Sequence, residues 1–190
     1  MPRPLAVALT GGIGAGKTEA LRAFARHGAA TASSDEAVHR LYREDESLRA
    51  ALRERWGERV FRDGEVDRAE IGRIVFADPD ELAWLEAELH PRVRALVDAW
   101  IREQDAGVVV VEIPLLYETG GEERFDRVVV VTAPAELREA RRGPGDGRER
   151  RLVPEEEKVR RADVVYVNDG TLEQLDAFVR SVLEELRSSS

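Results

Sequence analysis

The sequence predicts an α/β protein built on a mostly parallel five-stranded sheet, and three observations support this fold class. Short runs rich in β-branched residues recur along the chain, which is typical of strands buried on both faces of a sheet. Helical or loop sequence separates these runs, as the crossover connections between parallel strands require. The first run ends in a glycine-rich turn that leads into a predicted helix.

The five predicted strands cover residues 5–10, 29–34, 108–113, 128–131 and 164–167. The second of them carries the weakest signal, because it has few β-branched residues. Helices are expected from about Lys17, over residues 154–161, and after Asp169-Gly170-Thr171 through about Leu186. The alternation predicts helices on both faces of the sheet.

Residues 36–105 differ from this pattern and predict a helical insertion without a strong strand. Asp67 can cap one helix, Asp78-Pro79 can begin the next, and Pro91 is expected to begin another after His90. Apolar residues at helical spacing give the insertion a face that can pack beside the sheet.

The chain has 190 residues, no cysteine and a net charge of −9, with 35% charged residues. The negative charge argues against a broad nucleic-acid or anionic-membrane surface. The lack of cysteine excludes disulfides and thiolate zinc sites and fits a reducing compartment. No apolar run approaches the roughly 20 residues of a spanning helix, so we expect a cytoplasmic protein.

The glycine-rich turn matches the pattern G-x-x-x-x-G-K-[ST] of a phosphate-binding loop (P-loop), after a predicted strand and before a predicted helix. The expected ATP-binding residues are Gly12, Ile13, Gly14, Ala15, Gly16, Lys17 and Thr18. Backbone N–H groups of such a loop surround a phosphate, the lysine reaches the β and γ oxygens, and the hydroxyl can bind Mg²⁺. The fold class is therefore a P-loop NTPase fold with three layers.

The final strand leads to Asn168-Asp169-Gly170, without the Asn-Lys-x-Asp sequence with which GTPases recognise guanine. A kinase acting on a small molecule is therefore favoured over a GTPase. Such an enzyme needs an acidic group near the acceptor hydroxyl and arginines that neutralise the phosphoryl group.

Two acids follow predicted strands at the edge where ligands of parallel sheets bind. Asp35 could face the γ-phosphate, although spacing alone favours a helix N-cap. Glu112 ends a buried run, so it needs a partner, which could be a magnesium-bound water or a buried ion pair.

Arginines surround the glycine-rich segment after residue 142, at positions 138, 141, 142, 148, 150 and 151. Charge runs are usually solvated faces, but arginines beside a flexible segment of a P-loop protein favour a lid that closes over the phosphates. We expect this lid over residues 142–161.

The order of motifs resembles the dephospho-coenzyme A (dephospho-CoA) kinase family over nearly the whole chain. The matching parts are Thr10 to Thr18, Ser34-Asp35, Leu89-His90-Pro91, Ile113-Pro114-Leu115-Leu116-Tyr117-Glu118, Ala162-Asp163 and Asn168-Asp169-Gly170. The combination is far more specific than the P-loop alone.

The resemblance implies phosphorylation of the ribose 3′-hydroxyl of dephospho-CoA by ATP with Mg²⁺, giving coenzyme A (CoA) and ADP, the last step of CoA biosynthesis. It implies catalytic roles for Asp35 as base, for Lys17 and for Arg141 at the lid hinge, with Thr18 as magnesium ligand. The implied substrate-binding residues are Asp35, His90, Pro114, Leu115 and Leu116, and Asn168 is placed near the adenine.

The same resemblance divides the chain into a nucleotide-binding core (residues 1–35, 106–141 and 162–190), the helical CoA-binding insertion and the lid. The chain differs from the family at Ser33, where an acid is frequent, in its shorter lid, and at Leu152, where a glutamine is expected. Two alternatives follow: a nucleotide-binding regulatory module whose lid no longer supports transfer, or a kinase of another nucleoside or nucleotide.

Overall fold

The computed structural model describes residues 3–142 and 152–188 and divides into two compact units. One unit, here the nucleotide unit, comprises Met1–Ser33 and Ile101–Ser190. The other, here the helical unit, is Ser34–Trp100. The sequence places the boundaries of the insertion at 36 and 105, a few residues further along the chain.

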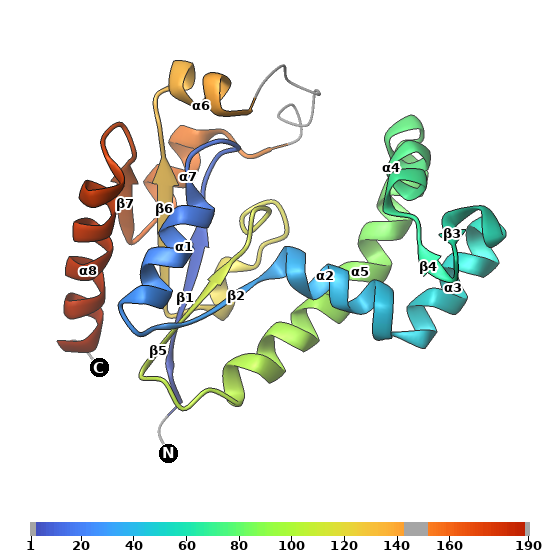
Figure 1. Ribbon diagram of the computed structural model, residues 1–190, viewed down its shortest axis with the longest axis horizontal. Coiled ribbons are helices and arrows are strands. Elements are labelled where there is room, and N and C mark those ends of the chain that lie inside the picture. Colours follow the sequence, from blue (N-terminus) through green and yellow to red (C-terminus); the bar gives the residue numbers. More distant parts are fainter. Residues whose placement is uncertain (1–2, 143–151, 189–190) are drawn as a thin grey trace. The chain divides into compact units, whose positions relative to one another are not determined.

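The nucleotide unit contains a five-stranded parallel sheet with the order β2-β5-β1-β6-β7 (Figure 1). Its strands are β1 (Leu5–Thr10), β2 (Ala30–Ser33), β5 (Val108–Glu112), β6 (Arg127–Thr132) and β7 (Val164–Val167). All five predicted strands are present, which confirms the predicted fold class. Runs of valine form the central strands because β-branched side chains pack well on a pleated surface.

The sheet is covered on both faces, so the unit has three layers. Helices α1 (Lys17–Arg26) and α8 (Leu172–Ser188) bury Phe24 and Leu183 against β1, β5 and β6. On the opposite face, Val159 of α7 (Glu155–Arg161) packs with Leu116 and Val130. A short 3₁₀ turn, η2 (Glu122–Arg124), precedes β6, and helix α6 (Ala135–Arg142) follows β6.

The strands are parallel, so their carboxyl ends lie at one edge of the sheet. The five chain segments that leave this edge begin after Thr10, Ser33, Glu112, Thr132 and Val167. The P-loop, Pro114 and Asn168 all follow these ends directly, so the topology brings them to one place.

The helical unit consists of α2 (Ser34–Glu44), α3 (Glu46–Trp56), α4 (Arg68–Ala77) and most of α5 (Pro79–Arg102), with the 3₁₀ turn η1 (Gly57–Val60). Apolar residues from all four helices form its core, including Leu41, Leu52, Val75 and Leu85. Asp67 accepts hydrogen bonds from the N–H groups of Ala69 and Glu70, so the predicted cap of α4 is confirmed.

One prediction for this unit is wrong. Pro91 does not begin a helix but lies inside α5, which runs unbroken for 24 residues. A proline inside a helix costs about 3 kcal/mol, and side chains on both sides of it, such as Leu85 and Leu96, pack into one core that outweighs this cost.

The sequence analysis also missed a small hairpin, formed by β3 (Phe61–Arg62) and β4 (Glu65–Val66). Asp63 and Gly64 connect its strands with positive φ angles of 51° and 82°. Asp-Gly is a favoured pair for such a turn, so the signal was present, but strands of two residues are too short for periodicity to detect.

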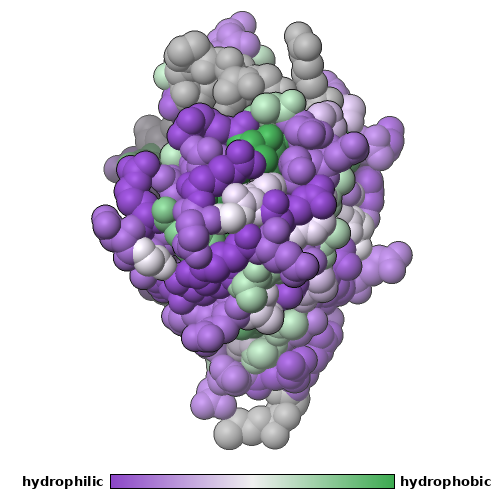
Figure 2. Space-filling view, turned by 90° about the vertical axis from the view of Figure 1, so that its right-hand side faces the viewer, coloured by the Kyte–Doolittle hydropathy of each residue, from purple (hydrophilic) through white to green (hydrophobic). Residues whose placement is uncertain are grey.

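Figure 2 shows a largely hydrophilic face in which hydrophobic side chains form only small patches. Within the described ranges 3–142 and 152–188, no helix is long and apolar enough to cross a membrane.

Candidate functional site

The P-loop connects β1 to α1, and glycine is required at two of its positions. Gly11 has a φ of 146°, and a Cβ atom there would lie 1.9 Å from the carbonyl oxygen of Val131. Gly16 has a φ of 100°, and its Cβ would lie 2.2 Å from Nδ2 of Asn168. Left-handed φ angles and these close approaches exclude other residues. Neighbouring elements therefore enclose the loop tightly.

Lys17 and Thr18 stand at the start of α1, immediately after the loop. Lys17 Nζ donates a hydrogen bond to the carbonyl oxygen of Gly12 at 3.0 Å, so the ammonium group lies across the loop. Thr18 is exposed. The partial positive charge of the helix N-terminus adds to the lysine charge, and the arrangement suits an anionic phosphate.

Asn168 and Arg141 support the P-loop from two other segments. The Asn168 side chain is 7% exposed, and its Nδ2 donates to the Ala15 carbonyl at 2.8 Å. Arg141 makes long contacts from Nη1 to the Gly14 carbonyl (3.4 Å) and from Nη2 to the Asn168 carbonyl (3.5 Å). Both expected site residues thus lie at the loop, although the Asn168 amide binds the protein backbone in this structure.

Glu112 is buried at the end of β5, in register with Leu9 of β1 and Ser33 of β2. This position is at the edge of the sheet where the P-loop begins. Hydroxyl and carboxylate oxygens are hard ligands that Mg²⁺ accepts, and Mg²⁺ usually retains waters and substrate phosphates besides one or two carboxylates. Thr18 and Glu112 have the chemistry to hold this ion with ATP.

No cluster of three or more His, Cys, Asp or Glu side chains that could hold a metal by itself occurs in residues 3–142 and 152–188. A metal site completed by substrate oxygens does not need one.

The segment after β5 separates the roles of its three predicted substrate-binding residues. The Thr10 hydroxyl lies 3.5 Å from the Pro114 carbonyl oxygen, to which it donates a long hydrogen bond. Leu115 is 39% exposed, whereas Leu116 is 0% exposed in the core beside α7. Leu115 and Pro114 can contact a ligand, but the Leu116 side chain contributes packing.

Asp35 and His90 belong to the helical unit. Asp35 lies two residues beyond β2, exposed in the first turn of α2, which begins at Ser34. Asp35 is therefore the second residue of α2, and its carboxylate lies in the first turn of the helix. His90 is half-buried near the middle of α5.

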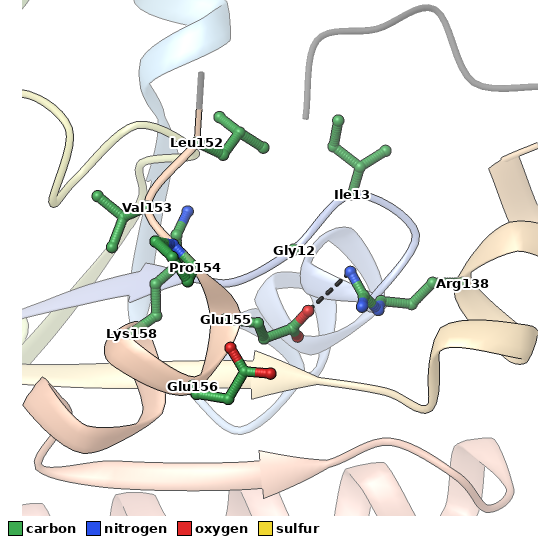
Figure 3. A pocket seen from close by; sticks show the side chains of 9 residues that line it. All are labelled: Gly12, Ile13, Arg138, Leu152, Val153, Pro154, Glu155, Glu156 and Lys158. Atoms are coloured by element: carbon green, nitrogen blue, oxygen red, sulfur yellow. Dashed lines mark ion pairs between the residues drawn. The ribbon is translucent and has the colours of Figure 1, made fainter. Parts of the chain in front are cut away.

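The sequence analysis missed an ion pair between Arg138 of α6 and Glu155 of α7, with Nη1 2.7 Å from Oε2 (Figure 3). The Thr132 hydroxyl donates to the other oxygen of Glu155. A Cβ atom on Gly12 would lie 2.9 Å from each of the two charged groups, so the pair lies directly against the P-loop. The sequence predicts Arg138 only as one of several lid arginines.

The Arg138–Glu155 pair borders a pocket of about 220 Å³. Its lining residues are Gly12, Ile13, Arg138, Leu152, Val153, Pro154, Glu155, Glu156 and Lys158 (Figure 3). The part of the predicted lid at 143–151 lies outside the described residues, so only its two ends, at α6 and from Leu152 onward, are seen.

Tyr117 can be excluded as a proton acceptor in this region. The Tyr117 pKa is raised to about 12, mainly because the phenol is buried; the Arg161 guanidinium opposes this rise, and the Glu122 and Asp163 carboxylates add to it. The phenol stays protonated at neutral pH.

A parallel sheet with a P-loop at the end of a central strand, enclosed by arginine and asparagine side chains, defines a P-loop nucleotide-binding protein of the kinase type. The family model of dephospho-CoA kinase matches residues 5–174. The chain therefore belongs to the dephospho-CoA kinase family.

Individual relatives agree with this membership. A dephospho-CoA kinase of Mesorhizobium japonicum is 43% identical and covers 96% of this chain and 97% of its own. One from Thermus thermophilus is 36% identical, with 96% and 92% covered. The predicted family is confirmed.

Solved structures share the fold. The crystal structure of TT1252 from Thermus thermophilus has a TM-score of 0.80 at 36% identity, covering 97% of this chain and 99% of that chain. A shikimate kinase of Aquifex aeolicus has a TM-score of 0.56 at 16% identity, with 95% and 97% covered, and supports the fold alone.

Proposed function

We propose that this chain transfers the γ-phosphoryl group of ATP to the ribose 3′-hydroxyl of dephospho-CoA and releases CoA and ADP. The observation that carries the proposal is the complete P-loop at the end of β1, in a chain that matches the dephospho-CoA kinase family over residues 5–174. Within residues 3–142 and 152–188, no contact favours the regulatory module or a kinase of another nucleoside.

The P-loop binds the ATP phosphates in this proposal. Its backbone N–H groups and the N-terminus of α1 supply fixed dipoles, and Lys17 moves from the Gly12 carbonyl to the β and γ oxygens. These groups stabilise the charge that develops as the phosphoryl group moves, and they are already arranged before the reaction begins.

Thr18 and Glu112 are the residues proposed to hold Mg²⁺, Glu112 through a water. The ion supplies positive charge to the β and γ phosphates when ATP is bound. The protein's part is to present one exposed hydroxyl and one buried carboxylate at the same edge of the sheet.

Asp35 accepts or orients the proton of the 3′-hydroxyl. A bond forms between the 3′ oxygen and the γ phosphorus as the bond from that phosphorus to the bridging oxygen of ADP breaks, and the hydroxyl proton passes to the Asp35 carboxylate. Arg141 stabilises the transferring group from the end of α6.

The helical unit, with His90, and the Pro114–Leu115 segment are proposed to bind the acceptor. An exposed leucine after β5 offers an apolar surface to the acceptor nucleotide, whereas Leu116 supports it from the core. Residues 142–161 act as the lid in this proposal.

The test is a product assay. Purified protein is incubated with Mg-ATP and, in separate reactions, dephospho-CoA, adenosine, AMP or pantetheine, and each product is identified by mass. We expect one phosphate added to dephospho-CoA alone. Phosphorylation of another acceptor instead, or ATP binding without any product, would overturn the proposal. Lys17→Ala, with its strongly lowered turnover, is the matched control.

A further inference from the structure

Lys158 is a buried lysine in a chain that otherwise uses arginine. Among the 29 Lys and Arg residues, only Lys17 and Lys158 are lysines. The Lys158 residue is 2% exposed, although it belongs to the otherwise highly charged α7. An ammonium group is compact, whereas a planar guanidinium needs room for five N–H donors. The lysine therefore suits a small enclosed site.

Glu118 is the partner of Lys158. Lys158 Nζ lies 2.8 Å from Glu118 Oε1, and the same oxygen accepts the N–H of Val153 at 2.9 Å. The Glu118 side chain is 12% exposed. In Figure 3 the Lys158 side chain extends from α7 toward Val153 and Pro154. One carboxylate oxygen thus joins the turn after β5 both to α7 and to the segment that precedes it.

The turn that contains Glu118 also presents Leu115. The Thr119 hydroxyl donates to the Leu115 carbonyl at 2.9 Å, and the Gly121 N–H donates to the Leu116 carbonyl at 2.9 Å. These bonds hold the turn's own shape. Glu118 adds an ion pair between this turn and α7.

Stability alone does not account for this pair. Removing two charges from water is costly, and apolar residues of similar volume are often as good or better. Leu116, Tyr117, Val153 and Val159 already join the same elements by apolar packing. Among the described residues, neither Lys158 Nζ nor Glu118 Oε2 makes a hydrogen bond of regular geometry. The Glu118–Lys158 ion pair therefore serves to fix one position of the turn after β5.

We infer that Glu118 and Lys158 are positioning residues that place the Pro114–Leu115 segment for the acceptor. This inference rests on the proposed function. In this inference the pair acts through the turn, although Lys158 also lines the pocket beside the P-loop. Its loss should therefore weaken use of the acceptor while ATP binding at the P-loop, which other side chains support, is retained.

The test compares three variants with wild type: Glu118→Gln, Lys158→Met and the double variant Glu118→Gln/Lys158→Met. The control is Glu122→Gln, which removes a more exposed ion pair with Arg161 that joins the same turn region to α7. For each protein we measure the thermal midpoint, the Kd for ATP, and kcat and KM for dephospho-CoA.

We expect each single variant to raise the KM for dephospho-CoA about tenfold or more, because small displacements of a binding group have large kinetic effects. The Kd for ATP should stay within about twofold of wild type, and the control should match wild type in both. The double variant should recover thermal stability, since it leaves no unpaired buried charge, but should keep the raised KM.

A stable double variant with a normal KM would overturn the inference and leave the pair a structural feature. An equal loss of ATP binding, or a double variant that does not fold, would also overturn it. Failure of the proposed function is distinct, because wild type itself would then form no CoA.

Discussion

The nucleotide unit and the helical unit hold their functional residues in different ways. Around the P-loop, backbone atoms and short contacts dominate: Gly11 and Gly16 admit no side chain, and Asn168 donates to the Ala15 carbonyl. The helical unit depends on side-chain packing, in which Trp56 meets Trp84 edge to face and Arg53 lies 4.1 Å from the centre of the Phe61 ring.

The difference indicates what each unit tolerates. A site made of backbone donors loses function when one charge or one glycine changes, while the fold around it persists. A unit held by an apolar core and caps loses stability gradually, because many contacts share the energy. Asp35 belongs to α2 of the helical unit but lies only two residues beyond β2 of the nucleotide unit. Its substitution can therefore affect both units.

The largest expected effect is that of Asp35→Asn. If Asp35 is the base, turnover should fall by about 10²–10⁴-fold, because asparagine has similar size but no basicity. Thermal midpoint and ATP affinity should remain near wild type. Turnover, calorimetry and ATP titration measure the three quantities. Near-normal turnover would reduce Asp35 to a favourable charge in the first turn of α2.

Lys17→Ala should lower turnover about a hundredfold, since one fixed charge near the transferring phosphoryl group is worth ~3 kcal/mol. The fold should persist, because the hydrogen bond from Lys17 Nζ to the Gly12 carbonyl lies within the loop itself. Arg22→Ala, on the exposed side of the same helix, is the control. A folded Lys17 variant with normal turnover would remove the residue from the mechanism.

Arg141→Ala should have a smaller effect, about tenfold on turnover, and should weaken ATP binding less than it slows transfer. Its contacts to the Gly14 and Asn168 carbonyls are long, so little stability depends on them. Arg22→Ala, on the exposed side of α1, controls for loss of charge. Unchanged turnover in the Arg141 variant would identify the arginines around Arg141 as a solvated face.

The smallest effect concerns Asp45, the N-cap of α3 in the helical unit. Burial opposes its ionisation, but hydrogen bonds from the Ser47 hydroxyl and the Leu48 N–H, with the Arg92 charge, lower its pKa overall. The lowered pKa means that the charged form is favoured in the folded state. Its contribution to stability is present above the unfolded pKa of 3.8 and is lost as pH falls through the folded value.

Asp45→Asn should therefore lower the thermal midpoint slightly at neutral pH and flatten the fall in stability below about pH 4. ATP affinity should not change. Thermal scans at several pH values, with Glu58→Gln as a control in the same unit, measure the effect. If the thermal midpoint of the variant falls below pH 4 as steeply as that of wild type, other carboxylates dominate the acid unfolding of this unit.

Much of the nucleotide unit could be predicted from the sequence. Valine runs predict buried parallel strands because each side chain alone favours that environment, and the P-loop pattern carries its own backbone requirements. Glu112, Pro114 and Asn168 could be placed at one edge of the sheet because the carboxyl ends of parallel strands meet there. Asp67 and Asp78-Pro79 could also be predicted as helix starts, because capping depends on residues next to one another in the sequence.

The tertiary structure decided what depends on distant partners. Pro91 stays inside α5 because leucines on both sides share one core, and the β3–β4 hairpin forms beside that core. The packing of α6 and α7 against the sheet decides which leucine after β5 faces solvent. It also brings Arg138 to Glu155 and Lys158 to Glu118. A pattern along the chain records local preference, but a pairing between residues far apart in the sequence depends on where whole elements pack.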